Sequence, residues 1–451
     1  MLFIMIILKQ FYNIRHFILK NGLFFRTEFP LRPPNAADVF YRQSRPDIYS
    51  NLGMVNENGP KWHNLRKLLA PPLMNHLTAA NYAAQMCLIG DDFVSLIGRN
   101  RQDSSQIITN LAQLTYRVGL ETVCAVALER RMGFLEQDIQ FDTQTIMDSI
   151  RGYQTASNQA MYEASSFWKY IPKKFSGAFT SLVKHKDNLH DRIGSIVSET
   201  IQSEEFQTSK NDESNKCSKT LKTKSILEQL SNVESLTLQD VKTSVVDYIT
   251  AGVDTIGNTM IFAIGLIAKH PNVQHKLQQE IDQYMSRNTQ HEYITPSVIK
   301  EMPYLRACVK ESFRMYPTAS QLARILEVDT EVSGGYILPK NSIVLCHHRV
   351  AALQEANFTR ADEFIPERWL EDRPKSWNLE PSLVVPFGTG KRSCPGKRLA
   401  EQEIHILIVK LFHSFDIQLL DDVSAEFNFL LTPSGPFRLK VTDRSNRFQR
   451  G

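Results

Sequence analysis

Residues 386–400 read PFGTGKRSCPGKRLA, and this stretch decides the fold. It surrounds one thiol, Cys394, with three glycines, two prolines and four basic side chains. A helix is expected to begin just after Gly396, which would place the sulfur at the positive end of the helix dipole. Nearby cations and backbone amides also favour the thiolate form of a cysteine, and the glycines let the backbone approach a large flat ligand. The stretch therefore predicts an anionic sulfur ligand on a metal centre.

The composition excludes several classes of protein. The chain has 451 residues, of which 42% are hydrophobic, enough to bury a large core. Its formal net charge is +4, too small an excess to indicate a nucleic-acid partner. The six cysteines lie far apart without a Cys-x-x-Cys pair, which argues against a disulfide scaffold and against a structural zinc site. No secretory cleavage site is evident, so we expect an intracellular, thiol-reducing setting.

A long helix is predicted to begin near Thr237 and to end before Pro271. Thr237 and Asp240 have the spacing of an N-terminal capping box. About 32 residues follow without proline, which corresponds to roughly 48 Å and is long enough to cross the core. Residues 251–255 (AGVDT) interrupt the apolar pattern, since glycine costs about 1 kcal/mol inside a helix and threonine can open it locally. An untidy structural helix and a functional site both explain this stretch.

The remaining pattern predicts helices with a small β region late in the chain. Residues 75–200 have mostly helical periodicity, and another helix is expected over residues 304–316. Short strands are expected within residues 325–350, with turns at 334–335 and 339–341, and a further strand pair within 427–442 turning at 433–435. Residues 203–225 are polar and are expected to form a surface loop. The fold class is therefore α+β and predominantly α-helical.

The cysteine loop resembles the haem-binding loop of the cytochrome P-450 monooxygenases, and this resemblance implies the family's fold, with a long central helix over the haem. The loop matches at Phe387, Gly390, Arg392, Cys394 and Gly396. Four further motifs occur in the family's order. They are Trp62-x-x-x-Arg66, Asp254-Thr255, Glu311-x-x-Arg314 and Phe364-x-Pro366-Glu367-Arg368.

The resemblance implies a haem b cofactor with Cys394 as its axial thiolate ligand, and O2 as the oxidant. Asp254 and Thr255 resemble the acid–alcohol pair that delivers protons to dioxygen, and Gly252 would leave room for dioxygen. By the same resemblance, the haem propionates would meet Trp62, Arg66, Arg324 and Arg392, because arginine suits a carboxylate. For Arg324, an ordinary strand arginine facing solvent is the alternative. Glu311, Arg314 and Arg368 would form a buried structural network.

The chain has no flavin domain and no Rossmann fingerprint, so electrons from NADPH must arrive through an external partner. Lys397-Arg398 resembles the paired basic residues with which mitochondrial members dock an acidic, adrenodoxin-like ferredoxin. A ferredoxin reductase supplies that ferredoxin with electrons. Arg306 and Lys310 could extend this basic patch. A solvated pair at an ordinary helix start is the alternative for Lys397 and Arg398.

Longer strings resemble insect members of the family that hydroxylate ecdysteroids, which implies a steroid substrate. The walls of the steroid-binding pocket would come from the long helix near Tyr248 and Ala251 and from residues 318–322 and 432–435. Another mitochondrial-type sterol hydroxylase, a truncated form that binds haem or steroid without catalysis, and a haem-thiolate isomerase are the alternatives. The Asp254-Thr255 pair argues against the isomerase. The strings lie at residues 56–60, 119–124, 130–134, 322–327 and 385–398.

The N-terminus departs from the family pattern. Residues 1–28 form an atypical segment with four basic residues and no acid before Glu28, which suggests either a transit or membrane-surface role or a buried helix. Residues 29–451 are expected to form the cytochrome P-450 domain, with its earliest strands shortened. We expect a peripheral membrane protein on the matrix side of the mitochondrial inner membrane, with the endoplasmic reticulum membrane as the alternative.

Overall fold

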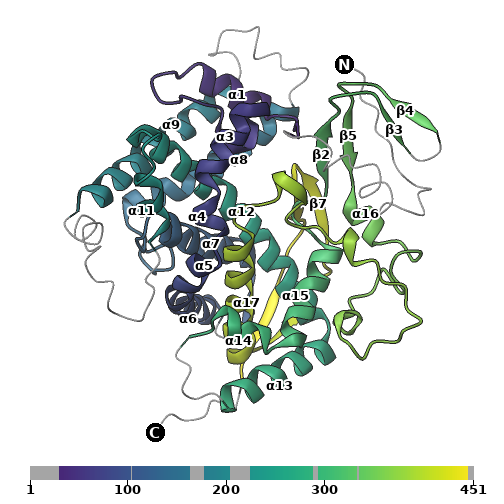
Figure 1. The fold of residues 1–451 in the computed structure, drawn as a ribbon. Coiled ribbons are helices and arrows are strands. Elements are labelled where there is room, and N and C mark those ends of the chain that lie inside the picture. Colours follow the sequence, from purple (N-terminus) through teal and green to yellow (C-terminus); the bar gives the residue numbers. More distant parts are fainter. Residues whose placement is uncertain are drawn as a thin grey trace, which may run out of the picture. The chain divides into compact units, whose positions relative to one another are not determined.

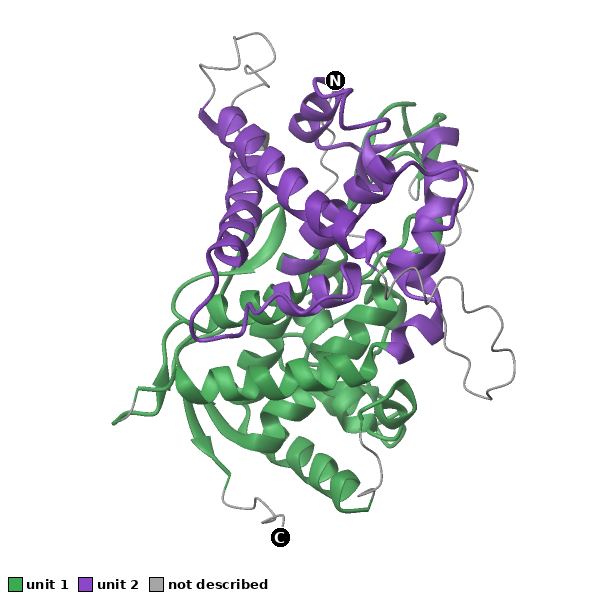
Figure 2. Ribbon diagram, turned by 90° about the vertical axis from the view of Figure 1, so that its left-hand side faces the viewer, with its two compact units in different colours: residues 1–31, 82–119, 254–451 green, residues 32–81, 120–253 purple. Residues whose placement is uncertain are grey.

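The computed structural model describes residues 30–102, 104–162, 177–203, 224–287, 293–332 and 335–444. The atypical segment 1–28 and most of the predicted loop 203–225 lie outside the described residues. The described chain forms helices and small sheets (Figure 1), which confirms the predicted α+β class. It separates into two compact units, one formed by residues 32–81 and 120–253, and the other by residues 1–31, 82–119 and 254–451 (Figure 2).

The unit formed by residues 32–81 and 120–253 is helical. The helices α8 and α9 pack against each other, and Tyr41, Phe179 and Leu182 lie in its buried apolar cluster. The Asn35 side chain caps α1 by accepting hydrogen bonds from the first amides of that helix. The unit contains α1 (Ala36–Gln43), α2 (Gly53–Asn56), α3 (Gly59–Leu69), α4 (Pro71–Met74), α5 (His76–Asn81), α8 (Phe141–Tyr162), α9 (Gly177–Gln202) and α11 (Ile226–Ser231).

The other unit contains the cysteine loop and packs around α17. This helix begins directly after Gly396, as the sequence predicts, and contacts α6, α13 and α15. Its helices are α6 (Ala83–Arg99), α13 (Pro271–Arg287), α14 (Pro296–Lys300), α15 (Pro303–Met315), α16 (His348–Ala352) and α17 (Lys397–Ser414), with 3-10 turns η4 (Pro366–Trp369), η5 (Pro381–Leu383) and η6 (Gly390–Arg392). Two helices, α7 (Leu111–Ala127) and α12 (Leu238–Lys269), contribute to both units.

The sheets are small and antiparallel, and they all belong to the unit with the cysteine loop. One sheet has three strands in the order β1-β9-β6, and three separate two-stranded sheets are formed by β2-β5, β3-β4 and β7-β8. An isolated bridge joins Leu31 to Ile325 of β2. The strands are β1 (Ile107–Ile108), β2 (Leu322–Ile325), β3 (Thr330–Val332), β4 (Tyr336–Leu338), β5 (Ile343–Cys346), β6 (Phe415–Leu419), β7 (Ala425–Asn428), β8 (Leu430–Pro433) and β9 (Leu439–Asp443).

Two details of the predicted β region are wrong. The chain turns between β7 and β8 at Phe429, not at 433–435, and β9 pairs with β6 and β1. Phe429 has φ of 64°, a conformation that a bulky residue rarely adopts. The sequence therefore has no typical turn residue from which this hairpin could be predicted. Gly435 does turn the chain, with φ of 81°, but it leads into another sheet. The segment after β5 forms α16, where the sequence predicts a strand up to residue 350.

The predicted long helix is confirmed as α12, which has 32 residues. The capping box is reciprocal, because the Asp240 amide donates to the Thr237 hydroxyl at 3.1 Å and the Thr237 amide donates to the Asp240 carboxylate at 3.0 Å. The helix runs without interruption through residues 251–255. Within the described residues, α12 alone is long and apolar enough to cross a membrane, and most of its apolar window is buried inside the protein.

Candidate functional site

Hydrogen bonds and two left-handed glycines shape the loop that presents Cys394. The Cys394 amide donates to the Phe387 carbonyl at 2.8 Å. Gly388 and Gly390 have φ of 69° and 72°, values at which a side chain would be strained. The Phe387 ring packs edge-on against Phe313 of α15, with 5.3 Å between ring centroids. The segment that precedes the cysteine is therefore tied both to the Cys394 amide and to α15.

Cys394 differs from the other cysteines that the structure describes. Its side chain is exposed, whereas Cys87, Cys124, Cys308 and Cys346 are buried. Burial raises the pKa of the Cys124 and Cys308 thiols and raises that of Cys346 to about 11, so those three stay protonated. Among the described cysteines, Cys394 is therefore the one that a ligand can reach.

The surroundings of the Cys394 sulfur fit a single thiolate ligand. Gly396 ends the loop as the N-cap of α17, and a Cβ atom at this position would lie 3.9 Å from the sulfur. The described residues hold no group of three or more His, Cys, Asp or Glu that could bind a metal by themselves. This donor set suits a metal that brings its own equatorial ligands, as haem iron does.

Two of the predicted propionate arginines lie in the same unit as Cys394. The Arg392 Nε donates to the Pro30 carbonyl at 2.9 Å, which ties the first described residue to the cysteine loop. Arg324 is 5% exposed, lies on β2 opposite Val344, and donates to its neighbouring carbonyl at 2.7 Å. A buried Arg324 contradicts the alternative that it is an ordinary solvent-facing strand residue.

The other two predicted propionate ligands lie on α3, in the helical unit. Trp62 is 1% exposed, and the Arg66 guanidinium contacts the sulfurs of Met54 and Met74 at 4.0 and 3.7 Å. The Tyr248 hydroxyl, on α12, donates to the carbonyl of Leu69 at the end of α3, with an oxygen–oxygen distance of 2.7 Å. This bond holds the helix that carries Trp62 and Arg66.

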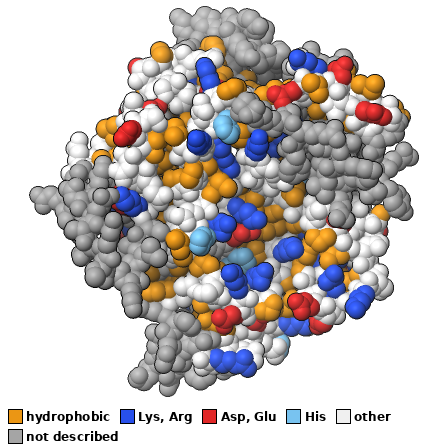
Figure 3. All heavy atoms as spheres, viewed as in Figure 1, with side chains coloured by type: hydrophobic (Ala, Val, Ile, Leu, Met, Phe, Trp, Pro, Cys, Tyr) orange, Lys and Arg blue, Asp and Glu red, His pale blue; other side chains and the backbone are white. Residues whose placement is uncertain are grey.

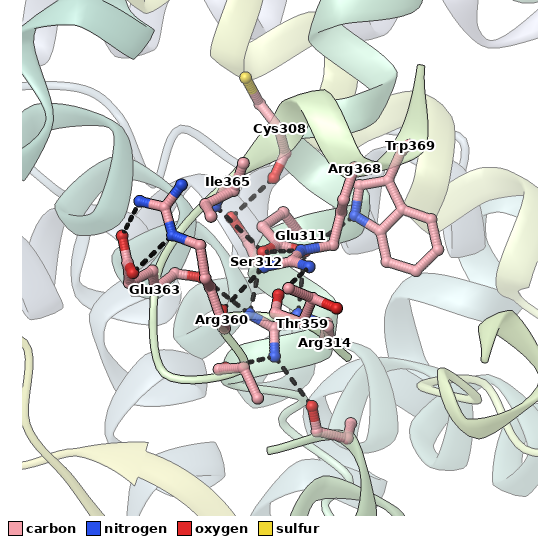
Figure 4. Close-up of polar contacts among 12 residues, drawn as sticks. Cys308, Glu311, Ser312, Arg314, Thr359, Arg360, Glu363, Ile365, Arg368 and Trp369 are labelled. Atoms are coloured by element: carbon pink, nitrogen blue, oxygen red, sulfur yellow. Dashed lines mark hydrogen bonds and ion pairs between the residues drawn. The ribbon is translucent and has the colours of Figure 1, made fainter. Parts of the chain in front are cut away.

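The structure brings Glu311, Arg314 and Arg368 together in one buried network (Figure 4). The Glu311 carboxylate, 0% exposed, accepts from Arg314 at 3.0 and 2.9 Å and from Arg368 at 2.8 Å. It also accepts from the Trp369 indole at 2.8 Å and from the Ile365 amide at 3.1 Å. Five hydrogen bonds therefore converge on one carboxylate.

The two arginines also donate hydrogen bonds to backbone carbonyls. Arg314 donates to three of them and Arg368 to two, at distances between 2.6 and 3.0 Å. The accepting carbonyls belong to Ala352, Thr359, Arg360, Ala361 and Glu363. The network thus holds the segment from α16 to η4 against α15. Sequence reasoning missed the Trp369 indole; its position directly after Arg368 was the signal available.

The predicted oxygen-handling residues lie near the middle of α12. Asp254 and Thr255 are half-buried. The Thr255 carbonyl accepts a hydrogen bond from the Thr259 hydroxyl at 2.6 Å. A Cβ atom at Gly252 would lie 2.9 Å from a methyl carbon of Val123 on α7. A side chain at this position would displace Val123, so the close packing of α12 on α7 favours glycine here, whatever else the residue does.

Four cations gather where α15 and α17 pack together. Lys397 and Arg398, at the start of α17, are exposed, as are Arg306 and Lys310 of α15. Partial burial and the positive charges of Arg306 and Lys397 lower the pKa of Lys310. Figure 3, in the same view as Figure 1, shows Lys and Arg side chains on the central and lower part of the surface, where Figure 1 draws the two helices. The sequence-predicted pair therefore belongs to a larger basic cluster.

A second buried charge network, which sequence reasoning missed, lies in the helical unit. Arg42 of α1 pairs with Asp38 at 2.9 Å and with Asp247 of α12, and the Lys186 amine of α9 lies 3.5 Å from Asp247. Burial alone would raise the pKa of Asp38, but Arg42 and Lys186 outweigh it and hold that pKa below its usual range. The network ties α1, α9 and α12 together.

A buried carboxylate joins two of the strings that the sequence singled out. Glu121, which is 0% exposed, lies in the string 119–124 and accepts from three donors in the string 130–134. The donors are the Arg131 Nε at 2.5 Å, the Met132 amide at 3.2 Å and the Phe134 amide at 2.6 Å. Glu121 therefore joins the two strings by hydrogen bonds at the end of α7.

Comparison with known proteins gives a family match over most of the chain. The sequence profile of the cytochrome P-450 family matches residues 27–441. Ecdysone 20-monooxygenase of Drosophila melanogaster is 33% identical, over 94% of this chain and 77% of that protein. A probable mitochondrial cytochrome P-450 of the same organism is 30% identical, over 93% and 79% of the two chains. Human mitochondrial 25-hydroxyvitamin D-1 alpha hydroxylase is 29% identical, over 87% and 76%.

Proposed function

The chain belongs to the cytochrome P-450 family of monooxygenases, and we propose that it hydroxylates a steroid, converting ecdysone to 20-hydroxyecdysone. The observation that carries the substrate is the similarity to ecdysone 20-monooxygenase, at 33% identity along 94% of the chain. The strings 119–124 and 130–134, which resemble ecdysteroid-hydroxylating members, meet at the buried Glu121. They support the relationship through the fold and not through substrate contact.

Within this proposal Cys394 supplies the thiolate ligand of haem. Bound haem activates dioxygen, and a thiolate ligand favours cleavage of the O–O bond. The exposed sulfur of Cys394, beside the N-terminus of α17, suits a ligand that must stay deprotonated. Arg324 and Arg392, in the unit that contains Cys394, and Arg66 and Trp62, on α3, are the residues that would pair with the haem propionates.

Asp254 and Thr255 are the proposed proton-delivery pair. Both side chains are half-buried on α12, so they can exchange protons with water while being held by the helix. Glu311, Arg314 and Arg368 act at a distance from the chemistry, because they hold the segment that follows α16. Their proposed role is structural.

We also propose that an adrenodoxin-like ferredoxin, reduced by NADPH through a ferredoxin reductase, docks on the basic cluster of α15 and α17. An acidic partner would be steered to the exposed Arg306, Lys310, Lys397 and Arg398, and salt would weaken its docking. Relatives named as mitochondrial support this electron source and a mitochondrial location. Peripheral attachment to the inner membrane from the matrix side is part of the same proposal.

Two measurements test the assignment. The reduced, carbon-monoxide-bound protein should have the red-shifted Soret band of thiolate ligation, and Cys394→Ser should lose it, whereas the buried-cysteine control Cys346→Ser should keep it. Reconstitution with ferredoxin, its reductase, NADPH and ecdysone should yield a product heavier by one oxygen. An unchanged spectrum in Cys394→Ser would contradict the ligand, and an intact spectrum without ecdysone turnover would contradict the substrate.

A different sterol is the second candidate substrate, because human 25-hydroxyvitamin D-1 alpha hydroxylase is 29% identical over 87% of this chain. Ecdysone carries several hydroxyls, and each one that is buried without a partner costs about 1–3 kcal/mol of binding. A pocket built for ecdysone must therefore offer hydrogen-bond partners, which a hydroxyl-poor sterol would leave unpaired. Ecdysone should therefore bind more tightly than a hydroxyl-poor sterol of similar size, measured by the substrate-induced spectral shift. Equal binding and equal turnover would favour the second candidate.

A further inference from the structure

A buried pair of threonine hydroxyls lies next to the proposed proton-delivery residues. Thr259 follows Thr255 by one turn of α12, and its Oγ1 lies 2.6 Å from the Thr255 carbonyl oxygen. The same Oγ1 lies 2.9 Å from the Oγ1 of Thr318, in the segment between α15 and β2. Thr259 and Thr318 are 6% and 5% exposed. The two hydroxyls therefore connect α12 to a segment 59 residues away in sequence.

The direction of the two hydrogen bonds follows from the chemistry of the groups. A carbonyl oxygen only accepts, so the single proton of the Thr259 hydroxyl goes to the Thr255 carbonyl. The Thr318 hydroxyl must then donate to the Thr259 oxygen. Both hydroxyls are satisfied in this arrangement, and consecutive bonds in a low-dielectric interior strengthen each other.

The Thr318 segment is itself held by neighbouring elements of the same unit. The Thr318 carbonyl accepts from the Leu431 amide of β8 at 2.8 Å. The next carbonyl, of Ala319, accepts from the His348 Nε2 at 2.6 Å. Burial lowers the pKa of His348 to about 4, so this contact stays neutral at physiological pH. Thr318 is therefore a well-held partner from which the α12 turn can be aligned.

We propose that Thr259 and Thr318 are positioning residues for Thr255, an inference that rests on the proposed monooxygenase role of that residue. A threonine that bonds the carbonyl four residues back tilts the peptide and bends the helix. Here the Thr259 hydroxyl that bonds the Thr255 carbonyl also accepts a hydrogen bond from Thr318, which fixes its position. The bridge sets the orientation of the Thr255 peptide, and with it the direction in which Thr255 presents its hydroxyl.

The bridge also links the proposed oxygen-handling turn to β8. Hydrogen bonds run from Leu431 to Thr318, from Thr318 to Thr259, and from Thr259 to Thr255. The segments 318–322 and 432–435 are expected to wall the substrate pocket. A change in β8 or in the segment 318–322 on substrate binding would therefore reach Thr255 through Thr318 and Thr259. The Thr318 hydroxyl donates its one proton to this bridge, so towards a substrate hydroxyl it could act only as an acceptor.

Threonine-to-valine and threonine-to-serine substitutions separate positioning from packing. Thr318→Val keeps the side-chain shape and removes the donor, whereas Thr318→Ser keeps the donor and removes a methyl group. Thr259→Val removes the bond to Thr255 as well. Thr145→Val is a matched control, because the Thr145 hydroxyl also bonds the carbonyl four residues back, at 2.8 Å, but on α8.

Amide hydrogen exchange of the haem-loaded protein is the first readout, and it needs no substrate. In Thr318→Val and Thr259→Val, exchange in residues 255–260 should accelerate roughly five- to tenfold, the factor that one net hydrogen bond provides. Thr318→Ser and Thr145→Val should stay within about twofold of wild type. The carbon-monoxide spectrum should be unchanged in all four variants. Equal exchange in Thr318→Val and Thr145→Val would overturn the proposal, as would acceleration in Thr318→Ser without acceleration in Thr318→Val.

The second readout is coupling, the amount of hydroxylated product per NADPH consumed. It should fall severalfold in Thr318→Val, with peroxide released instead, and Thr318→Ser should restore it. Thr259→Val combined with Thr318→Val should be no worse than Thr259→Val alone, because both act through one bridge. Wild-type coupling in Thr318→Val would overturn the proposal. If wild type hydroxylates another steroid but not ecdysone, only the substrate assignment fails, and coupling is measured with that steroid.

Discussion

Replacing Glu311 with glutamine should strongly destabilise the unit that holds the cysteine loop. The carboxylate is 0% exposed and accepts five hydrogen bonds, three of them from two guanidiniums. Arg314 and Arg368 are 0% and 1% exposed, so the substitution leaves two buried positive charges without their counter-charge. Breaking a buried ion pair on one side costs about 3–5 kcal/mol. Domains are commonly stable by only about 5–15 kcal/mol, so the loss is a large fraction of the total.

Urea unfolding of the haem-loaded protein measures this loss directly. Trp369 donates its indole N–H to Glu311, so the part of the fluorescence that Trp369 contributes, defined by comparison with Trp369→Phe because the chain has four tryptophans, reports on the network. Glu363→Gln is the matched control, because it removes the carboxylate of an exposed pair with Arg360 in the same segment. The control should unfold at nearly the wild-type urea concentration.

The outcome that would refute the reasoning is equally direct. If Glu311→Gln and Glu363→Gln unfold at the same urea concentration, the convergence of five donors on Glu311 contributes no net stability. Water would then have to reach the two arginines in the variant. An unchanged Trp369 emission in Glu311→Gln would also contradict the indole contact.

Three further predictions concern the helical unit. The pKa of Asp38 is lowered by Arg42 and Lys186 against the effect of burial, so its contribution is present at neutral pH and is lost as pH falls below about 4; Asp38→Asn should weaken the acid dependence of the urea midpoint. Glu121→Gln should cost about 1–3 kcal/mol and speed amide exchange at its two backbone donors. Tyr248→Phe should lower stability by about 1 kcal/mol in thermal unfolding and speed loss of haem to apomyoglobin.

Each of these predictions has an outcome that contradicts it. An acid dependence in Asp38→Asn identical to that of wild type would mean that its carboxylate is not stabilised by the network. Slow exchange in Glu121→Gln would mean that the loop at 132–134 is held by other contacts. A wild-type haem-loss rate in Tyr248→Phe would separate the end of α3 from haem retention.

Local signals are sufficient for the helices that the sequence predicts correctly. The long helix was expected from Thr237 to Pro271, and α12 occupies Leu238–Lys269, because a capping box and a proline define its ends. The start of α17 after Gly396 follows from the same kind of signal. The turn at Phe429 has no such signal, since its positive φ is imposed by the strands on either side.

The candidate site divides in the same way. Motif spacing names Glu311, Arg314 and Arg368, because a family pattern records residue types at fixed positions. It does not name Trp369 or Thr318, whose roles come from contacts across 58 and 59 residues. The family resemblance around Asp254-Thr255 also implies that Gly252 leaves room for dioxygen. The packing of α12 on α7 is a second reason for glycine at this position, and only the structure reveals it.

Asp254 and Thr255 lie between two anchored parts of α12, and this arrangement explains why a local pattern cannot define their geometry. On the N-terminal side, Asp247 pairs with Arg42 and lies 3.5 Å from the Lys186 amine. On the C-terminal side, Thr259 bonds to Thr318. Asp247 precedes Asp254 by two helical turns, about 10 Å. Every partner that holds these anchors is remote in sequence, so the helix is predictable from its own residues while the alignment of its central turn is not.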